Sequence, residues 1–162
     1  METRAHDPEL LLSQIQSLME GAPNLIAGLA NVSSALMESI PLLNWAGFYL
    51  LDQGRLVLGP FCGRVACTLI PLGKGVCGTA TKEDRILRVD DVHRFEGHIA
   101  CDNVSRSELV VPIHVKGAVI GVLDLDSPVE GRFQEEDEAL MRSVGQLIDA
   151  HADALSPAYS LN

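Results

Sequence analysis

The sequence is poor in positive charge and contains no long apolar run. Twelve lysines and arginines against 22 aspartates and glutamates give a formal net charge of -10 at pH 7. This deficit argues against nucleic acid or an anionic membrane as a partner, because both require a basic surface. No apolar run reaches the roughly eighteen residues of a membrane span, and the first residues lack the apolar core of a signal peptide. We expect a cytoplasmic protein that binds neither nucleic acid nor membrane.

Cysteine is also scarce, and no C-x-x-C pair occurs. The four cysteines lie at positions 62, 67, 77 and 101, too few and too uneven for a disulfide scaffold in 162 residues. In a reducing compartment they are expected to be thiols, metal ligands or catalytic groups. His93, His98 and Cys101 form the spacing H-x4-H-x2-C, which matches none of the usual closed zinc patterns. We therefore expect no metal site.

Hydrophobic residues make up 47% of the chain, which is ample for one core, and neither a repeat nor a low-complexity tract interrupts it. We predict a single domain over residues 1–162, with a core from about 10 to 152 and a frayed tail at 156–162. Apolar steps of three and four predict helices at 8–20, 24–41 and 133–151.

Between the second and last helices the apolar period changes to two. This pattern predicts strands at 44–51, 55–60, 65–70, 86–89, 107–115 and 119–126. The order of elements indicates an α+β domain, in which a central antiparallel sheet carries the N- and C-terminal helices on one face and a ligand cavity on the other.

A candidate reactive thiol lies just before the fifth of these strands. Cys101 is close in sequence to His98 and Arg106. Basic neighbours lower a thiol pKa and supply the nucleophilic thiolate. The alternative is a buried cysteine with a packing role only.

Three carboxylates are predicted to share one sheet face near that thiol. In the strands at 107–115 and 119–126, Glu108, Asp124 and Asp126 alternate with apolar residues and so project from the face opposite the apolar rows. When several carboxyl groups crowd one cavity, the repulsion between their charges tends to keep one of them protonated. A half-solvated sheet face without function gives the same alternation, and this alternative stays open.

Two further segments are candidates for ligand contacts. Trp45 and Tyr49 share a strand face, where they either line a pocket or pack in the core. Gly75, Val76 and Cys77 lie where a glycine-rich loop enters a short helix. Backbone N–H groups at such a start can bind a carboxylate or phosphate, and the helix dipole can activate the thiol of Cys77. The P-loop spacing G-x-x-x-x-G-K-[ST] is missing, so a nucleotide P-loop is not supported.

The order of elements resembles a GAF domain, and seven motifs resemble those of the free methionine-(R)-sulfoxide reductase family, a resemblance that covers roughly residues 10–150. These motifs are Asn44-Trp45-Ala46-Gly47-Phe48-Tyr49, Leu58-Gly59-Pro60-Phe61, Gly75-Val76-Cys77-Gly78-Thr79-Ala80, Asp91-Val92-His93, Gly97-His98-Ile99-Ala100-Cys101-Asp102, Ser105-Arg106-Ser107-Glu108 and Leu123-Asp124-Leu125-Asp126-Ser127.

The resemblance implies an enzyme that reduces the sulfoxide of free methionine with a thiol, in defence against oxidative stress. It implies Cys101 as nucleophile, with Cys67 and Cys77 as the other redox cysteines and Cys62 outside the pattern. By the same resemblance, the acidic positions are Glu108, Asp124 and Asp126, and the aromatic pocket is formed by Trp45 and Tyr49.

The implied cycle leaves Cys101 as a sulfenic acid, which a second cysteine converts to a disulfide. Cys67 is favoured over Cys77 for this step, and the choice stays open. The resemblance implies thioredoxin as the external reductant, without a bound cofactor, and a homodimer remains open. The alternative function is a stand-alone GAF module that binds a small molecule or senses redox state without catalysis.

Overall fold

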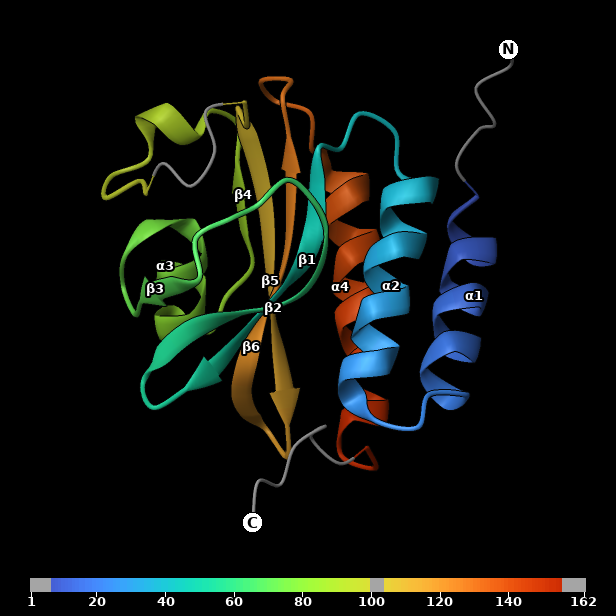
Figure 1. Cartoon of the computed structure of the whole chain (residues 1–162). Helices are drawn as coiled ribbons and strands as arrows, with labels where there is room; N and C mark the ends of the chain where they lie inside the picture. The colour runs from blue at the N-terminus through green and yellow to red at the C-terminus, as the bar shows by residue number, and fades with distance from the viewer. Residues whose placement is uncertain (1–6, 100–103, 156–162) are drawn as a thin grey trace.

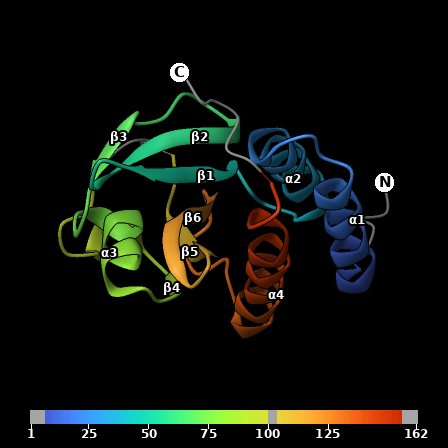
Figure 2. The same ribbon diagram turned by 90° about the horizontal axis from the view of Figure 1, so that it is seen from below.

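The computed structural model describes residues 7–99 and 104–155. Its elements follow the order α1 (Pro8–Glu20), α2 (Leu25–Ser39), β1 (Trp45–Asp52), β2 (Arg55–Gly63), β3 (Leu69–Pro71), α3 (Gly75–Glu83), β4 (Leu87–Val89), a 3-10 turn (Val92–Arg94), β5 (Ser107–Val115), β6 (Ala118–Ser127) and α4 (Glu135–Ala152). Helices α2 and α4 cover one face of a curled sheet, α1 packs on the outer side of these two helices, and α3 covers the other face of the sheet (Figures 1 and 2). No helix in the described part is long and apolar enough to cross a membrane.

The helices begin where the sequence provides caps. The Asp7 carboxylate accepts from the backbone N–H groups of Glu9 and Leu10, and Pro8 occupies the first turn, where its missing N–H costs nothing. Asn24 accepts from the N–H of Ala27 at 2.9 Å. Helix α4 starts with a capping box, and acidic residues fill its first turn. The three predicted long helices are thus confirmed within a few residues at each end.

The six strands pair antiparallel in the order β3-β2-β1-β6-β5-β4. Because successive side chains along a strand point to opposite faces of the sheet, they pack into two separate cores. One row of β5, with Leu109, Val111 and Ile113, belongs to the core that also contains apolar residues of α1, α2 and α4, whereas Val110 belongs to the cluster under α3. The apolar row of side chains lies on the sheet face that α2 and α4 cover. The polar side chains of β5 and β6 alternate with this row and therefore point toward α3.

The predicted strand at 65–70 is wrong in extent, because β3 begins only at Leu69. Two aromatic side chains donate hydrogen bonds to backbone carbonyl groups in the segment before β3. The indole N–H of Trp45 donates to the carbonyl oxygen of Arg64, and the Tyr49 hydroxyl donates to that of Cys67. These carbonyl groups accept hydrogen bonds from side chains and not from a neighbouring strand. Cys67 lies in the loop before β3.

His114 connects three elements at the edge of the sheet. Its Nδ1 lies 2.9 Å from Asp149 Oδ2 on α4, and its Nε2 lies 2.7 Å from Asp84 Oδ1 at the end of α3. Burial lowers the pKa of His114, but the two carboxylates outweigh that effect and raise the pKa above its usual value. The imidazolium therefore joins α3 and α4 through β5.

This linkage predicts a pH-dependent contribution to stability. The contribution of a group whose folded pKa is raised is complete below its unfolded pKa of about 6.5, and it is lost as pH rises through the folded pKa. We expect His114→Gln to lower the free energy of unfolding more at pH 6 than at pH 9. The difference should be below about 1 kcal/mol, since the Asp84 partner is half exposed. Urea unfolding of both proteins at the two pH values measures it, and an equal loss at both would contradict the linkage.

Candidate active site

A cavity of about 60 Å³ opens between the sheet and α3. It brings together every described residue that the sequence suggested for ligand binding, namely Trp45, Tyr49, Gly75, Val76, Cys77, Glu108, Asp124 and Asp126. A single water needs about 10–15 Å³ by this measure, so the space suits a few small groups and is too small for a nucleotide. Lys74, His98 and Ile99 also line it.

The three carboxyl groups come from two neighbouring strands. Glu108 on β5 lies directly opposite Asp126 on β6, and Asp124 lies opposite Val110. Only 9% of Glu108 and 4% of Asp124 is exposed. The sequence thus predicted correctly that the three residues share a face, but the face is buried under α3 and is not a half-solvated surface.

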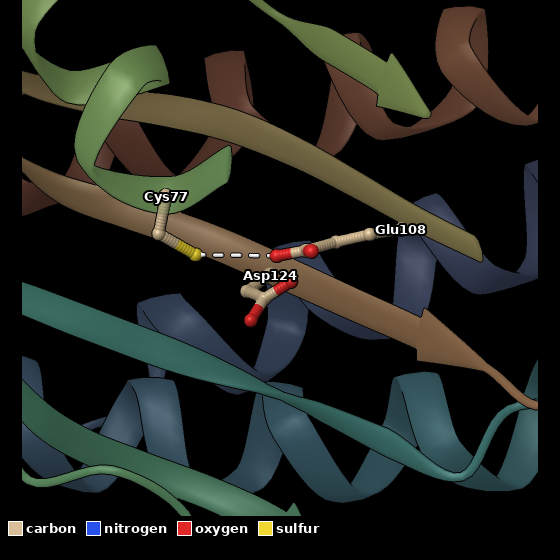
Figure 3. A group of neighbouring side chains, drawn as sticks. All are labelled: Cys77, Glu108 and Asp124. Carbon is tan, nitrogen blue, oxygen red and sulfur yellow. Dashed lines mark hydrogen bonds between the residues drawn. The ribbon is translucent and has the colours of Figure 1, made fainter. Parts of the chain in front are cut away.

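Cys77, in the first turn of α3, points at these carboxyl groups (Figure 3). Its Sγ lies 3.5 Å from Glu108 Oε1, to which the thiol donates. The Sγ atom of Cys77, one carboxyl oxygen of Glu108 and one carboxyl oxygen of Asp124 all lie within 4.8 Å of one another. Among the described residues no group forms a hydrogen bond with the buried Oδ1 of Asp124. The cavity therefore holds a thiol and two carboxyl groups in contact range, with one acceptor oxygen left for a ligand.

Burial and crowding keep protons on this cluster. Burial, followed by the charge of Asp126, raises the pKa of Glu108 to about 8. Burial and the Glu108 charge raise the pKa of Asp124, and burial and the Asp124 charge raise that of the Cys77 thiol. The idea that the helix dipole activates Cys77 is therefore wrong, because Cys77 is a neutral thiol at pH 7. Glu108 is mainly a neutral acid at that pH.

The aromatic wall formed by Trp45 and Tyr49 is supported by a residue that the sequence reasoning missed, Phe61. The ring centroids of Trp45 lie 5.8 Å from Tyr49 and 5.2 Å from Phe61, and both pairs are stacked. A Cβ on Gly47 would lie 2.3 Å from the Phe61 Cβ, so the close approach of β2 requires glycine there. Burial, followed by the charge of Asp124, raises the Tyr49 pKa, and the phenol stays a hydrogen-bond donor. The Gly47 and Phe61 pair in the matched motifs was the available signal.

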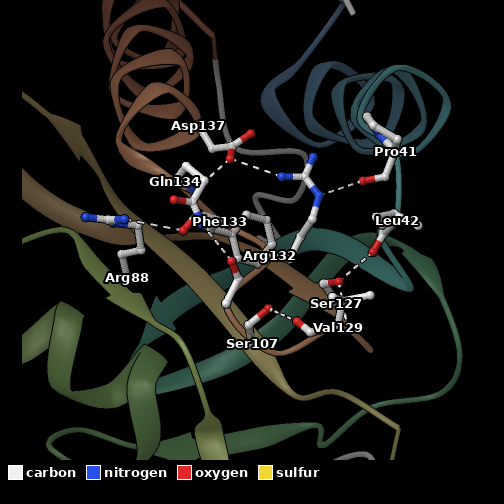
Figure 4. Close-up of polar contacts among 11 residues, drawn as sticks. Pro41, Leu42, Arg88, Ser107, Ser127, Val129, Arg132, Phe133, Gln134 and Asp137 are labelled. Atoms are coloured by element: carbon white, nitrogen blue, oxygen red, sulfur yellow. Dashed lines mark hydrogen bonds and ion pairs between the residues drawn. The ribbon is translucent and has the colours of Figure 1, made fainter. Parts of the chain in front are cut away.

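Buried serines fix the ends of the two acidic strands (Figure 4). Ser107, next to Glu108, donates to the carbonyl oxygen of Val129 at 2.6 Å, and Ser127, next to Asp126, donates to that of Leu42 at 2.6 Å. Arg132 donates to the carbonyl oxygen of Pro41 and pairs with Asp137 at 3.0 Å, which ties the same corner to α4. These contacts set the register that places the carboxyl groups opposite each other.

The glycine-rich entry to α3 is partly used by the fold itself. The Gly75 N–H donates to the carbonyl oxygen of Gly97 at 3.0 Å, so it is not free for a ligand. Lys74 precedes the helix without a side-chain cap, which leaves the first-turn N–H groups of Val76 and Cys77 as the anion donors.

The cysteines differ in state. Cys62 and Cys77 are free, and Cys67 is disulfide-bonded. Cys101 lies outside the described residues.

Arg106, which the sequence suggested as the basic neighbour of Cys101, pairs with Glu130 at 3.0 Å and with Asp91 at 3.7 Å. Burial and the nearby His93 lower the pKa of His98, so this imidazole is neutral at pH 7. Neither described neighbour offers the unpaired positive charge that was expected.

Comparison with known proteins identifies the family of this fold. The GAF domain family model matches residues 26–151. The free methionine-R-sulfoxide reductase of Escherichia coli is 54% identical over 79% of this chain and 78% of its own. The fRMsr structure of Staphylococcus aureus in reduced form has a TM-score of 0.89 and 46% identity, covering 94% of this chain and 99% of that chain.

The X-ray structure of the Neisseria meningitidis free methionine-R-sulfoxide reductase in complex with its substrate also has a TM-score of 0.89, with 38% identity over 95% of each chain. The α+β fold and the resemblance that the motifs indicated are thereby confirmed. This chain belongs to the free methionine-R-sulfoxide reductase family of GAF domains.

Proposed function

We infer that this chain reduces free L-methionine-(R)-sulfoxide to methionine. The observation that carries this inference is the buried Glu108, whose pKa of about 8 keeps a proton in a small cavity with an aromatic wall. A sulfoxide sulfur is a poor electrophile until its oxygen is protonated or strongly hydrogen-bonded. The relatives named above support the same activity.

The remaining groups suit the two ends of a free amino acid. Asp124 and Asp126 would bind the substrate ammonium, for which the unpaired Oδ1 of Asp124 is an acceptor. The first-turn N–H groups of α3 would bind the carboxylate. Trp45 and Tyr49 would enclose the S-methyl group, because stacked rings offer a flat apolar surface.

In the proposed reaction, Cys101 attacks the sulfoxide sulfur while Glu108 protonates the oxygen. The S–O bond of the substrate breaks, and the cysteine sulfur takes the oxygen as a sulfenic acid. Methionine sulfur is thereby reduced by two electrons and Cys101 oxidised by two. The Cys67 thiol then displaces the hydroxyl as water and forms a disulfide, which thioredoxin reduces by exchange.

Cys67 suits the second step better than Cys77. Cys67 is the disulfide-bonded cysteine, whereas Cys77 is free, only 4% exposed and hydrogen-bonded to Glu108. Burial also raises the pKa of Cys77, which makes it a poor thiolate nucleophile. We assign Cys77 to the wall of the pocket and not to the resolving step.

Turnover of separated epimers tests the function. With thioredoxin, thioredoxin reductase and NADPH, the R epimer of free methionine sulfoxide should be consumed and the S epimer should not. N-acetylation should reduce kcat/KM at least about tenfold, because it leaves the carboxyl groups without the ammonium. Cys101→Ser should release no methionine in a single turnover, and Cys62→Ser should react normally. No turnover of either epimer would identify a binding module instead of an enzyme.

The assignment of the resolving cysteine predicts a specific cross-link. One equivalent of the R epimer, added to reduced protein, should produce a Cys67–Cys101 disulfide in peptides digested without reductant. Cys67→Ser should complete one turnover and then lose most thioredoxin-dependent cycling, while Cys77→Ser should keep cycling. Cross-linked peptides that contain Cys77 or Cys62, with normal cycling of Cys67→Ser, would reject the assignment.

The role of Glu108 as acid predicts a falling limb in the pH profile. Glu108 holds its proton below its pKa of about 8 and loses it above, so kcat/KM should fall about tenfold per pH unit beyond pH 8. Glu108→Gln should lower kcat/KM by about 10²–10⁴-fold and remove this limb. Glu9→Gln, on the exposed side of α1, is the matched control and should keep the wild-type profile. A falling limb that persists in Glu108→Gln would assign the acid elsewhere.

A further inference from the structure

Three potential metal ligands converge in the cavity from three separate elements. Cys77 on α3, Glu108 on β5 and Asp124 on β6 each offer one atom, and these atoms lie within 4.8 Å of one another (Figure 3). Zn–S and Zn–O bonds of about 2.3 and 2.0–2.2 Å place the ligand atoms of a tetrahedral zinc ion about 3.5 Å apart. The distance of 3.5 Å between Cys77 Sγ and Glu108 Oε1 matches this spacing. The register of β5 with β6 and the packing of α3 hold these atoms in place before any ion binds.

A second observation points to a missing hydrogen-bond donor or cation. Asp124 is 4% exposed, and its Oδ1 is buried without a hydrogen-bond partner among the described residues. A buried carboxylate oxygen without a partner is costly, so the site is built to receive a donor or a cation. In catalysis the substrate ammonium would fill this role, and between turnovers the oxygen remains available.

We propose that Cys77, Glu108 and Asp124 form a site for a thiophilic divalent cation, with Zn²⁺ as its best fit, and that the bound cation competes with the substrate. One sulfur and two carboxylate oxygens suit a borderline-soft ion, whereas Mg²⁺ and Ca²⁺ require six or more oxygen ligands. Three protein ligands leave the fourth tetrahedral position for water. The sequence predicted no metal site, because the spacing of His93, His98 and Cys101 matches no usual closed zinc pattern. In the structure the two imidazole rings meet edge-on at 5.7 Å and His93 is exposed.

The consequence for activity rests on the proposed function. A cation at this site occupies the place of the substrate ammonium. Its ligands must also be deprotonated, so Glu108 has no proton to give while the cation is bound. Zinc thus stops the reductase reversibly without oxidising any cysteine, and substrate protects against it.

Two matched triple variants isolate the proposed thiol ligand. Replacing Cys62, Cys67 and Cys101 by serine leaves Cys77 as the only cysteine, and replacing Cys67, Cys77 and Cys101 leaves only Cys62. Co²⁺ added to the Cys77-only protein should give a thiolate-to-cobalt charge-transfer band in the near ultraviolet. One equivalent of Zn²⁺ should abolish this band. The Cys62-only protein should give no band, and circular dichroism should show both proteins folded.

Competition within the Cys77-only protein links the metal to the pocket without any turnover. Adding free methionine-(R)-sulfoxide should lower the absorbance of the cobalt band. Introducing Asp124→Asn should weaken cobalt binding about tenfold or more, because losing a ligand costs at least as much as losing an outer-shell contact. Absence of the band in folded Cys77-only protein, or a band that Asp124→Asn leaves unchanged, would overturn the site.

Inhibition then tests the consequence separately. In the wild-type enzyme, Zn²⁺ should raise the apparent Kd for sulfoxide and leave the maximal rate unchanged in single-turnover assays, where no thioredoxin is present to bind the metal. A cobalt band in the Cys77-only protein, with no sulfoxide turnover by the wild-type protein, would refute the proposed function and leave the metal site standing. Zinc that lowers the maximal single-turnover rate with the apparent Kd unchanged would refute competition at this cavity.

Discussion

The structure depends on the burial of carboxyl groups on the sheet face that α3 covers. Leu109 and Leu123 must face α2 and α4, because they fill the larger core. The pleat then turns Glu108 and Asp124 to the other side, where the fold excludes water. Isolated charges would cost several kcal/mol each in such surroundings, so the groups retain protons instead. The chemistry of the site follows from this constraint, since a neutral acid at pH 7 is what a sulfoxide oxygen requires.

The same constraint decides the state of Cys77. A helix N-terminus favours a thiolate by about 0.3–1 kcal/mol, which is less than one pKa unit. Full burial beside two carboxyl groups acts in the opposite direction and can shift a pKa by several units. The larger effect wins, and the thiol donates a hydrogen bond to Glu108. A cysteine at the start of a helix is therefore activated only where the surrounding charges permit it.

Local patterns predicted what local forces determine. Caps and apolar spacing predicted α1, α2 and α4, and alternation predicted that Glu108, Asp124 and Asp126 share a face. Contacts between distant segments were beyond such patterns. The strand predicted at 65–70 is shortened where the distant Tyr49 hydroxyl takes the carbonyl oxygen of Cys67 and the Trp45 indole takes that of Arg64 just before it. The convergence of residues 77, 108 and 124 likewise needs the packing of α3 over the sheet, which no spacing encodes.

Two aromatic residues that line the cavity also anchor the loop that carries Cys67. Tyr49 lines the cavity with its ring and donates its hydroxyl proton to the carbonyl oxygen of Cys67 at 2.9 Å, and Trp45 holds Arg64 in the same loop at 3.1 Å. The loop that carries Cys67 is thus anchored by the side chains that would enclose the substrate methyl group. A movement of the Cys67 backbone would stretch or break the Tyr49 hydrogen bond, whereas rotation of the Cys67 side chain alone would leave it intact. Because Tyr49 stacks on Trp45, and Trp45 on Phe61, the anchor of this loop and the aromatic side chains beside the cavity form one packed unit.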